Sequence, residues 1–439
     1  MRLLASALCL AACLVPIKAF VPWRPDVSDL DPATLHAIKP PPPAALRRHN
    51  LQISRAAAKF TRRAHASTTS NSRPVARPVA PLARREDKTS GPIGLSSDPN
   101  DISYWVNVDF GSSQKSFRLV LDTGSADTWV PSSECIAQSC LAHRTYGPGD
   151  SSTLTFTDNK TFSIKYASGN VEGSIVNDSL SLGPVTLENV SFGLATVVSD
   201  DFTAFPVDGI LGLGFPSASV QKVPTFLDNL ISQQIITKRV FGVHLHRSSD
   251  AAGNGSVIFG GIDSSRIEGG PTALKYYSLN TTSHLWSIRL SDVLIDGKSA
   301  GFEEGRNVVI DTGTALVLIP PDDALKLHQP ISGTRSNGQT FYIPCNTNVR
   351  LKLRFGSDEY EISPKDYVGD VVDAGNNLCL SLIVGRSVNR IWEGCTGSLF
   401  NQNEYDDFSP PPNCLNSIRS PHNNQDHHPQ WLVAFFSAF

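Results

Sequence analysis

The sequence carries one short motif twice, each time directly after an apolar run. LVLDTGSADTWVP occupies residues 119–131 and VVIDTGTALVLIP occupies 308–320, so that Asp122 and Asp311 lie 189 positions apart. Aspartate is costly to bury unless it is hydrogen-bonded or paired. Two Asx-type turns at strand ends are the plain alternative. A single copy would arise by chance in on the order of one chain in a hundred, and two matched copies are far rarer.

Each residue of the motif has a physical role in the setting that we expect. The glycines let the backbone turn tightly, and the residues after them supply hydroxyls that can orient the carboxylates. The threonines between aspartate and glycine can tie the two loops to each other. The six supporting residues are Thr123, Gly124, Ser125, Thr312, Gly313 and Thr314.

If both loops face one cleft, their two carboxyl groups cannot both ionise easily, so the pKa of one falls, that of the other rises, and one proton is shared. The ionised group can then act as general base on a water molecule, while the protonated one hydrogen-bonds the carbonyl of a peptide. This chemistry needs no metal and no cofactor. It predicts hydrolysis of peptide bonds at acid pH, with Asp122 and Asp311 as the catalytic pair.

The body of the chain is predicted to be mostly β. From about residue 102 the sequence shows short alternating apolar runs broken by Gly, Asn, Asp and Ser, which is typical of strands and turns. Long helical patterns are few, and the clearest lies at 225–236. The runs around the second motif echo those around the first, so we expect two related lobes, 101–280 and 281–385, with the cleft between them.

The N-terminus reads as a secretory signal peptide over residues 1–19, because one arginine precedes a short apolar run. A buried helix is the alternative. In a secreted protein, Cys135 and Cys140, five positions apart, suit a small disulfide loop. A metal site is the alternative there, but no His/Cys cluster with zinc-like spacing accompanies them. Five Asn-x-Ser/Thr sequons are compatible with a glycosylated surface.

Residues 20–100 differ from the rest in charge. They hold 13 Lys/Arg and 6 Asp/Glu, whereas residues 101–439 hold 23 and 35. A basic, Pro-rich segment before an acidic body suggests a removable pro-segment that inhibits its own enzyme and is cleaved near Arg85. A disordered linker is the alternative. Nucleic-acid binding is not expected, because the basic stretch lacks interleaved aromatic residues.

At these motifs the chain resembles the pepsin-like aspartic endopeptidases, over roughly residues 102–385. The resemblance implies a bilobal acid protease fold, and it makes IKYASG the flap, a hairpin that closes over substrate through Tyr166 and Gly169. Trp129 would hydrogen-bond the flap tyrosine. An ordinary strand tyrosine and simple core packing are the alternatives for Tyr166 and Trp129.

The resemblance also implies further residues and properties. It implies that Phe202 and Ile210 line the main apolar substrate pocket, for which core packing is the alternative. Both Cys135–Cys140 and Cys345–Cys379 fit the disulfide placements of the family. The family cleaves peptides between bulky apolar residues and is made as an acid-activated zymogen. We therefore expect a monomer that acts on peptides or proteins, without stable membrane insertion.

The C-terminal end, 386–439, departs from the family pattern. By the spacing of the first lobe, an apolar-apolar-Gly strand should fall near position 401, but the sequence there reads RIWEGCTGSLFNQNEYDDF. The rest shows no strand pattern, and the pairing of Cys395 and Cys414 is left open. Either the tail packs differently or the reading frame departs after about Val384. We expect the strand that supports Asp311 to be missing.

Three functions follow from these observations. The first is an endopeptidase that is secreted, with vacuolar or cell-wall association as variants of its location. The second is a catalytically impaired or inactive binding protein on the same scaffold, which the aberrant tail favours. The third, a structural cell-wall protein, leaves the two aspartates unexplained.

Overall fold

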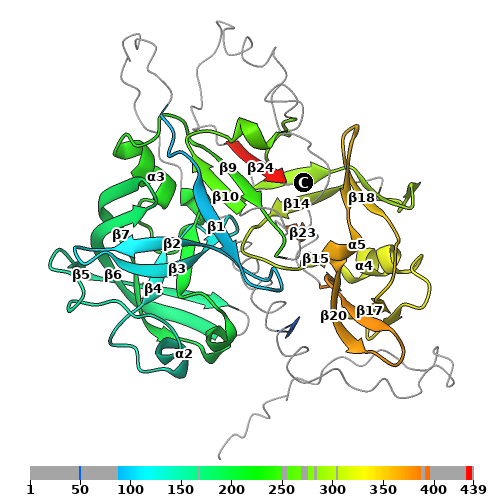
Figure 1. The fold of residues 1–439 in the computed structure, drawn as a ribbon, viewed down its shortest axis with the longest axis horizontal. Helices are drawn as coiled ribbons and strands as arrows, with labels where there is room; N and C mark the ends of the chain where they lie inside the picture. Colours follow the sequence, from blue (N-terminus) through cyan, green and yellow to red (C-terminus); the bar gives the residue numbers. More distant parts are fainter. Residues whose placement is uncertain are drawn as a thin grey trace, which may run out of the picture. The chain divides into compact units, whose positions relative to one another are not determined.

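The computed structural model describes residues 49–50, 88–166, 169–248, 255–267, 275–280, 284–302, 305–386, 391–395 and 432–437, the last two ranges by their main chain only. The predicted signal peptide, most of the predicted pro-segment and Cys414 lie outside these ranges. Within them the fold is mostly β, as predicted (Figure 1).

The largest sheet has eleven strands, in the order β24-β9-β10-β1-β2-β3-β8-β4-β7-β6-β5. Strands such as β2, YWVNVDF, alternate between buried and more exposed residues, which is the pattern of a sheet with one face on a core. Strands β8, β9 and β10 are buried along their whole length. The bounds are β1 Ile93–Ser97, β2 Tyr104–Phe110, β3 Lys115–Asp122, β4 Trp129–Pro131, β5 Thr155–Tyr166, β6 Gly169–Leu182, β7 Val185–Val198, β8 Gly209–Gly212, β9 Val240–Leu245, β10 Gly255–Phe259 and β24 Leu432–Ser437.

Three smaller sheets follow in the second half of the chain. A five-stranded sheet has the order β11-β14-β23-β15-β22, and two four-stranded sheets have the orders β13-β12-β18-β19 and β16-β17-β21-β20. The bounds are β11 Ser287–Leu290, β12 Asp292–Ile295, β13 Lys298–Ser299, β14 Arg306–Ile310, β15 Val317–Ile319, β16 Arg335–Ser336, β17 Phe341–Pro344, β18 Leu351–Phe355, β19 Asp358–Ile362, β20 Val368–Asp373, β21 Leu378–Ser381, β22 Ile383–Gly385 and β23 Ile391–Cys395.

Helices are short. The clearest, α3, begins after a capping box in which Thr225 and Asp228 exchange hydrogen bonds, and it ends at Ser232, four residues before the predicted end. The described helices are α2 Gln138–Leu141, α3 Phe226–Ser232, α4 Pro321–His328 and α5 Pro364–Tyr367, with 3₁₀ turns η4 Asp200–Ala204, η5 Pro216–Ala218 and η6 Ser264–Arg266. None of the helices in the described ranges has the length and apolar character needed to cross a membrane.

The two lobes repeat one arrangement of five strands. In the first, β2 is antiparallel to β3, β3 parallel to β8, β8 antiparallel to β4, and β4 parallel to β7. In the second, β11, β14, β23, β15 and β22 pair in the same order and with the same directions. Each lobe buries its own main apolar cluster. The prediction of two related β lobes is therefore confirmed.

The supporting strand of the second lobe is present, so the expectation that it is missing was wrong. Strand β23 runs parallel to β14 and antiparallel to β15, in the place that β8 occupies in the first lobe. Main-chain hydrogen bonds carry this pairing, so IWEGC can form it without the apolar-apolar-Gly pattern. The register shifts between Val309 and Ile310, where the pairing becomes irregular.

Two other segments join the large sheet from outside the predicted lobes. Residues 432–437, for which we predicted no strand, form β24 parallel to β9 (Figure 1); they are an apolar run, LVAFFS, that completes a sheet edge. Residues 93–97, which we assigned to the pro-segment, form β1 between β10 and β2 and bury Ile93 and Leu95. The predicted cleavage near Arg85 lies before β1.

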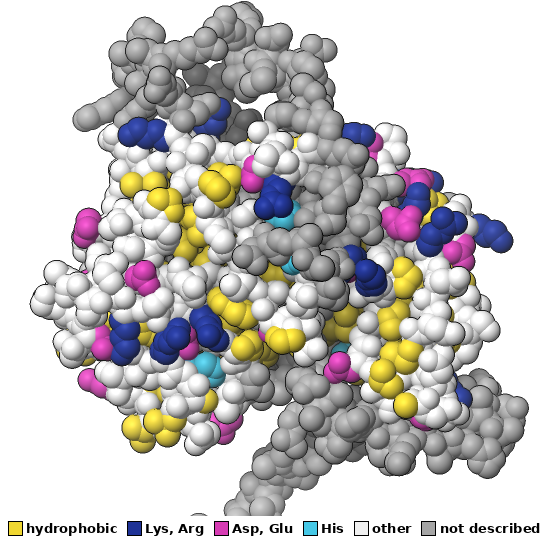
Figure 2. Space-filling view, in the orientation of Figure 1, with side chains coloured by type: hydrophobic (Ala, Val, Ile, Leu, Met, Phe, Trp, Pro, Cys, Tyr) yellow, Lys and Arg dark blue, Asp and Glu magenta, His cyan; other side chains and the backbone are white. Residues whose placement is uncertain are grey.

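The surface carries charges of both signs close to one another. On the face in Figure 2, basic and acidic side chains occur in neighbouring positions, with apolar side chains scattered among them. Partly exposed ion pairs such as Lys115–Asp150 and Arg354–Glu359 fit this distribution. Such pairs contribute only about 0–1 kcal/mol each, so the lobes depend mainly on their apolar cores.

Candidate active site

The two aspartates of the repeated motif end equivalent strands. Asp122 is the last residue of β3, and Asp311 directly follows β14. Both are fully buried. Because β3 and β14 hold corresponding positions in their lobes, the fold presents the two carboxyl groups from matched loops.

Each carboxylate is held in the same way by its own loop. The backbone N–H of Gly124 donates to Oδ1 of Asp122 at 3.0 Å, and Gly313 donates to Oδ1 of Asp311 at 2.9 Å. The hydroxyls of Ser125 and Thr314 donate to the two Oδ2 atoms, both at 2.5 Å. These bonds fix the orientation that the motif predicted for the hydroxyls.

Reciprocal hydrogen bonds join the two loops through the threonines. The N–H of Thr123 donates to Oγ1 of Thr312 at 3.1 Å, and the N–H of Thr312 donates to Oγ1 of Thr123 at 2.9 Å. Each hydroxyl then donates across the interface, to the carbonyl of Ile310 at 2.8 Å and to that of Leu121 at 2.5 Å. All these groups are buried, so each bond would be costly to leave unmade.

Gly124 lies directly against the opposite aspartate. A Cβ atom added there would lie 2.4 Å from Cγ and 2.5 Å from both carboxylate oxygens of Asp311. The carboxyl group of one lobe is therefore in contact with the loop that carries the other. Only glycine leaves this space, which gives the glycine of the motif a steric role in addition to its turn.

The strand behind Asp122 supports its loop. Beyond β8, the N–H of Leu213 donates to the Asp122 carbonyl at 2.8 Å, and that of Gly214 donates to the Ser125 carbonyl at 2.7 Å. A Cβ on Gly212 would lie 2.5 Å from backbone atoms of Ala126 and Asp127. The glycines of VDGILGLGF thus allow the strand to lie against the loop.

Sequence reasoning missed two residues that stabilise this region. The buried Asp127 accepts hydrogen bonds from the Ser219 hydroxyl and from the N–H groups of Val220 and Gln221, at 2.7–3.1 Å. Its position five residues after Asp122, still within the motif, was the available signal. Trp286 donates from Nε1 to the Leu213 carbonyl at 3.0 Å, and only its place in the echoed LWSIRL run pointed to it.

The predicted flap is a hairpin of β5 and β6, in which Tyr166 pairs with Gly169. Residues 167–168 and the Tyr166 side chain lie outside the description. Trp129 is 1% exposed, and its indole Nε1 has no hydrogen-bond partner among the described groups. The hydrogen bond from Trp129 to the flap tyrosine therefore stays a prediction.

Phe202 and Ile210 do come together, in a pocket beside Trp129. The other lining residues are Pro131, His143, Val198, Val207, Asp208 and Gly209. The rings of Phe202 and Trp129 meet edge to face, with centroids 5.5 Å apart. The lining is apolar except for His143 and Asp208, two polar side chains that sequence reasoning did not place here.

Both predicted disulfides are present. Cys135–Cys140 closes the short loop that leads into α2, and Cys345–Cys379 joins the end of β17 to β21. Strand β23 ends at Cys395, whose side chain is not described. No group of three or more potential metal-binding side chains occurs in the part of the chain that the structure describes.

Comparison with known proteins agrees with this geometry. Residues 103–409 match the family model of the eukaryotic aspartyl proteases, and the chain belongs to that family. The match extends beyond residue 385, where we expected the resemblance to end.

Several relatives are named as proteases. The chain is 38% identical to "Probable aspartic-type endopeptidase CTSD" of Trichophyton verrucosum over 316 residues, which cover 72% of this chain and 60% of that relative. It is 37% identical over 327 residues to "Aspartic-type endopeptidase ctsD" of Aspergillus fumigatus, covering 74% and 67%. It is 32% identical over 318 residues to human cathepsin D, covering 68% and 76%. The chain thus matches only about three fifths of the length of the Trichophyton relative.

Proposed function

We propose that this protein is an aspartic-type endopeptidase that hydrolyses peptide bonds at acid pH. The observation that carries the proposal is the pair of buried aspartates, each held by one backbone N–H and one hydroxyl of its own loop. The Asp122 loop lies directly against the Asp311 carboxyl group, and two carboxyl groups held this close to each other cannot both ionise easily, so they share one proton. Family membership and the names of the relatives support the same reaction.

The shared proton gives the two aspartates complementary roles. The ionised carboxylate removes a proton from a water molecule between the pair, while the protonated one donates a hydrogen bond to the peptide carbonyl. Attack by the water oxygen, with transfer of the proton from the protonated aspartate to the carbonyl oxygen, gives a tetrahedral diol. The proton taken from water then passes to the leaving nitrogen, a diol hydroxyl returns its proton to the other aspartate, and the C–N bond breaks. The threonine bonds between Thr123 and Thr312 keep the loops in register, because such a site loses rate when its groups move by about 1 Å.

For substrate preference, we propose bulky apolar residues next to the cleaved bond. The apolar pocket of Trp129, Phe202 and Ile210 supports this, with the side chain before the cleaved bond as its occupant. The hairpin that carries Tyr166 and Gly169 would close over the peptide.

For localisation, we propose that the protein is secreted, with vacuolar or cell-wall association as variants. For maturation, we propose that a basic pro-segment inhibits the monomeric enzyme until it is removed. The charge difference between residues 20–100 and the remainder supports this. N-terminal sequencing of secreted protein tests it: we expect a start near Glu86, and a start before Arg47 would contradict it.

Purified protein incubated with a denatured protein at pH 3–5 tests the reaction. We expect cleavage by the unaltered chain and none by Asp122→Asn, with the variant's circular dichroism spectrum unchanged. Cleavage that persists in Asp122→Asn would refute the catalytic assignment. A folded chain that cleaves nothing would instead indicate the inactive binding protein.

A further inference from the structure

His143 holds a position that the reaction above does not explain. It follows α2 and lines the apolar pocket together with Phe202 and Asp208. Its Nδ1 lies 2.5 Å from the Ser139 carbonyl oxygen, and its Nε2 lies 2.8 Å from the Phe205 carbonyl oxygen. The ring therefore links the disulfide loop to the chain directly after η4.

Both partners of this imidazole are carbonyl oxygens, which can only accept hydrogen bonds. A neutral imidazole carries one N–H and one lone pair, whereas the imidazolium carries two N–H groups. Only the protonated form can satisfy both contacts at once. In the neutral form a ring lone pair would face a carbonyl oxygen, and one bond would be lost.

Another histidine of this chain shows the contrast. In the second lobe, Nδ1 of His328 lies 2.7 Å from the Ala324 carbonyl, and its Nε2 lies 2.7 Å from the Ser381 hydroxyl. A hydroxyl can donate as well as accept, so a neutral ring satisfies both contacts of His328. His143 has no such donor opposite either nitrogen.

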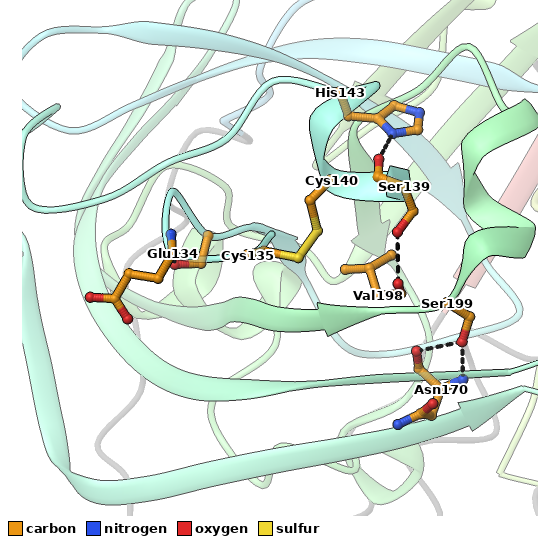
Figure 3. Close-up of a disulfide and its surroundings, with 9 residues drawn as sticks. Glu134, Cys135, Ser139, Cys140, His143, Asn170, Val198 and Ser199 are labelled. Carbon is orange, nitrogen blue, oxygen red and sulfur yellow. Dashed lines mark hydrogen bonds between the residues drawn. A yellow bond between two sulfur atoms is a disulfide. The ribbon is translucent and has the colours of Figure 1, made fainter. Parts of the chain in front are cut away.

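The segment that His143 holds forms one wall of the pocket. Helix α2 is anchored on the other side, where the Ser139 hydroxyl donates to the Val198 carbonyl at 2.7 Å (Figure 3). The Phe205 N–H donates to the Phe202 carbonyl at 3.1 Å, so the carbonyl that His143 binds belongs to the same turn as the pocket residue Phe202. A bond at Phe205 thus restrains the ring that packs on Trp129.

Charged groups of both signs lie beside the pocket that the ring lines. Asp208 lines the same pocket and is 8% exposed; it accepts from the N–H of Arg144 and lies 3.6 Å from the Arg144 guanidinium. Asp200 and Asp201 are the charged residues of η4, and α2 carries none.

We propose that His143 is a positioning residue whose protonated ring clamps the disulfide loop to the turn of Phe202, so that the apolar pocket is held in its binding shape at acid pH and loosens toward neutrality. Histidine side chains in general change charge between about pH 5 and pH 8. This role of His143 rests on the proposed function, because it regulates substrate binding in the pocket of that enzyme. It acts on binding, separately from the shared proton of the aspartates.

Kinetics with two peptides test the effect on the pocket. The peptides differ only by Phe or Ala before the cleaved bond, and KM and kcat are measured from pH 3.5 to 6.5 for the unaltered chain, His143→Gln and His284→Gln. His284 is an exposed histidine and serves as the matched control. The ratio of the two KM values (Phe peptide over Ala peptide) measures how well the pocket binds a bulky apolar side chain, and the ratio rises as that binding weakens.

We expect this ratio to rise about three- to tenfold across that range in the unaltered chain and in His284→Gln, the factor that one hydrogen bond contributes. In His143→Gln the ratio is expected to be raised already at pH 3.5 and to stay flat, while kcat keeps its pH profile. A ratio in His143→Gln that follows the unaltered chain would overturn the proposal.

A second measurement needs no activity. In Asp122→Asn protein labelled with ¹⁵N-histidine, the His143 resonances are assigned by their loss in His143→Gln. We expect two protonated ring nitrogens at pH 4.5 and the loss of one proton toward pH 7. A neutral ring at pH 4.5 would refute the clamp even if the protein proves to be no protease. Conversely, a protonated ring without any cleavage by the unaltered chain would refute the proposed function alone.

Discussion

Acidification should weaken the packing of the second lobe through His328. This side chain, in the last turn of α4, is 1% exposed and stacks on Phe341 with ring centroids 3.9 Å apart. Its neutral form is satisfied, because Nδ1 donates to the Ala324 carbonyl and Nε2 accepts from the Ser381 hydroxyl. Burial lowers the pKa of His328 to about 4, the hydrogen bond to Ala324 opposing this only in part.

The size of the effect follows from the difference between folded and unfolded pKa values. In the unfolded chain this histidine has a pKa of 6.5 and binds a proton below that pH, whereas in the folded chain it binds the proton only below about pH 4. Stability is therefore full above pH 6.5 and falls as the pH drops from 6.5 to 4. Each pKa unit is worth about 1.4 kcal/mol, so the loss amounts to roughly 3 kcal/mol.

Urea unfolding of the Asp122→Asn chain, in which self-digestion is avoided, measures this loss. The same variant with His328→Gln added lacks the titrating group. The free energy of unfolding of the second lobe should fall between pH 6.5 and pH 4 in both chains. We expect this fall to be about 3 kcal/mol smaller in the double variant than in Asp122→Asn alone. Equal pH dependence in the two chains would refute the reasoning, and so would a double variant that loses more than the single one.

Two further predictions follow from contacts between parts of the chain. Gly124→Ala would press a methyl group against the Asp311 carboxylate, so we expect kcat to fall by at least about 100-fold with an unchanged fold; near-normal kcat would contradict this. Arg247 is 4% exposed and binds the Asp366 carboxylate through two nitrogens at 2.7–2.8 Å. Asp366→Asn would remove this negative charge and leave the Arg247 charge buried. We expect a loss of about 3–5 kcal/mol in urea unfolding, and a loss below 1 kcal/mol would count against it.

The aspartate loops could be read from the sequence because their chemistry is local. An aspartate followed by glycine and a hydroxyl residue can form its bonds within four positions, and the structure shows these bonds at Asp122 and Asp311. The contacts between the loops needed one further premise, that the two copies face each other. The duplication supplied that premise.

The environment of His143 could not be read in this way. Its second partner, Phe205, lies 62 positions away, and no motif marks either residue. The same holds for the buried ion pair of Arg247 and Asp366, 119 positions apart. Such contacts depend on how loops of different strands meet, which a single sequence does not encode as a pattern.

The tail shows the opposite error, in which a missing pattern was taken as a missing strand. An inner strand needs main-chain partners on both sides, and β14 and β15 offer them to any segment that can extend between them. The apolar-apolar-Gly pattern of β8 reflects a further demand, since Gly209 and Gly212 lie against backbone atoms of Trp129 and of the Asp122 loop. In β23, Glu393 pairs with Val309 of β14. The corresponding strand β8 consists only of apolar residues and glycines. The strand can therefore be present while its contact with the Asp311 loop differs from that of its counterpart.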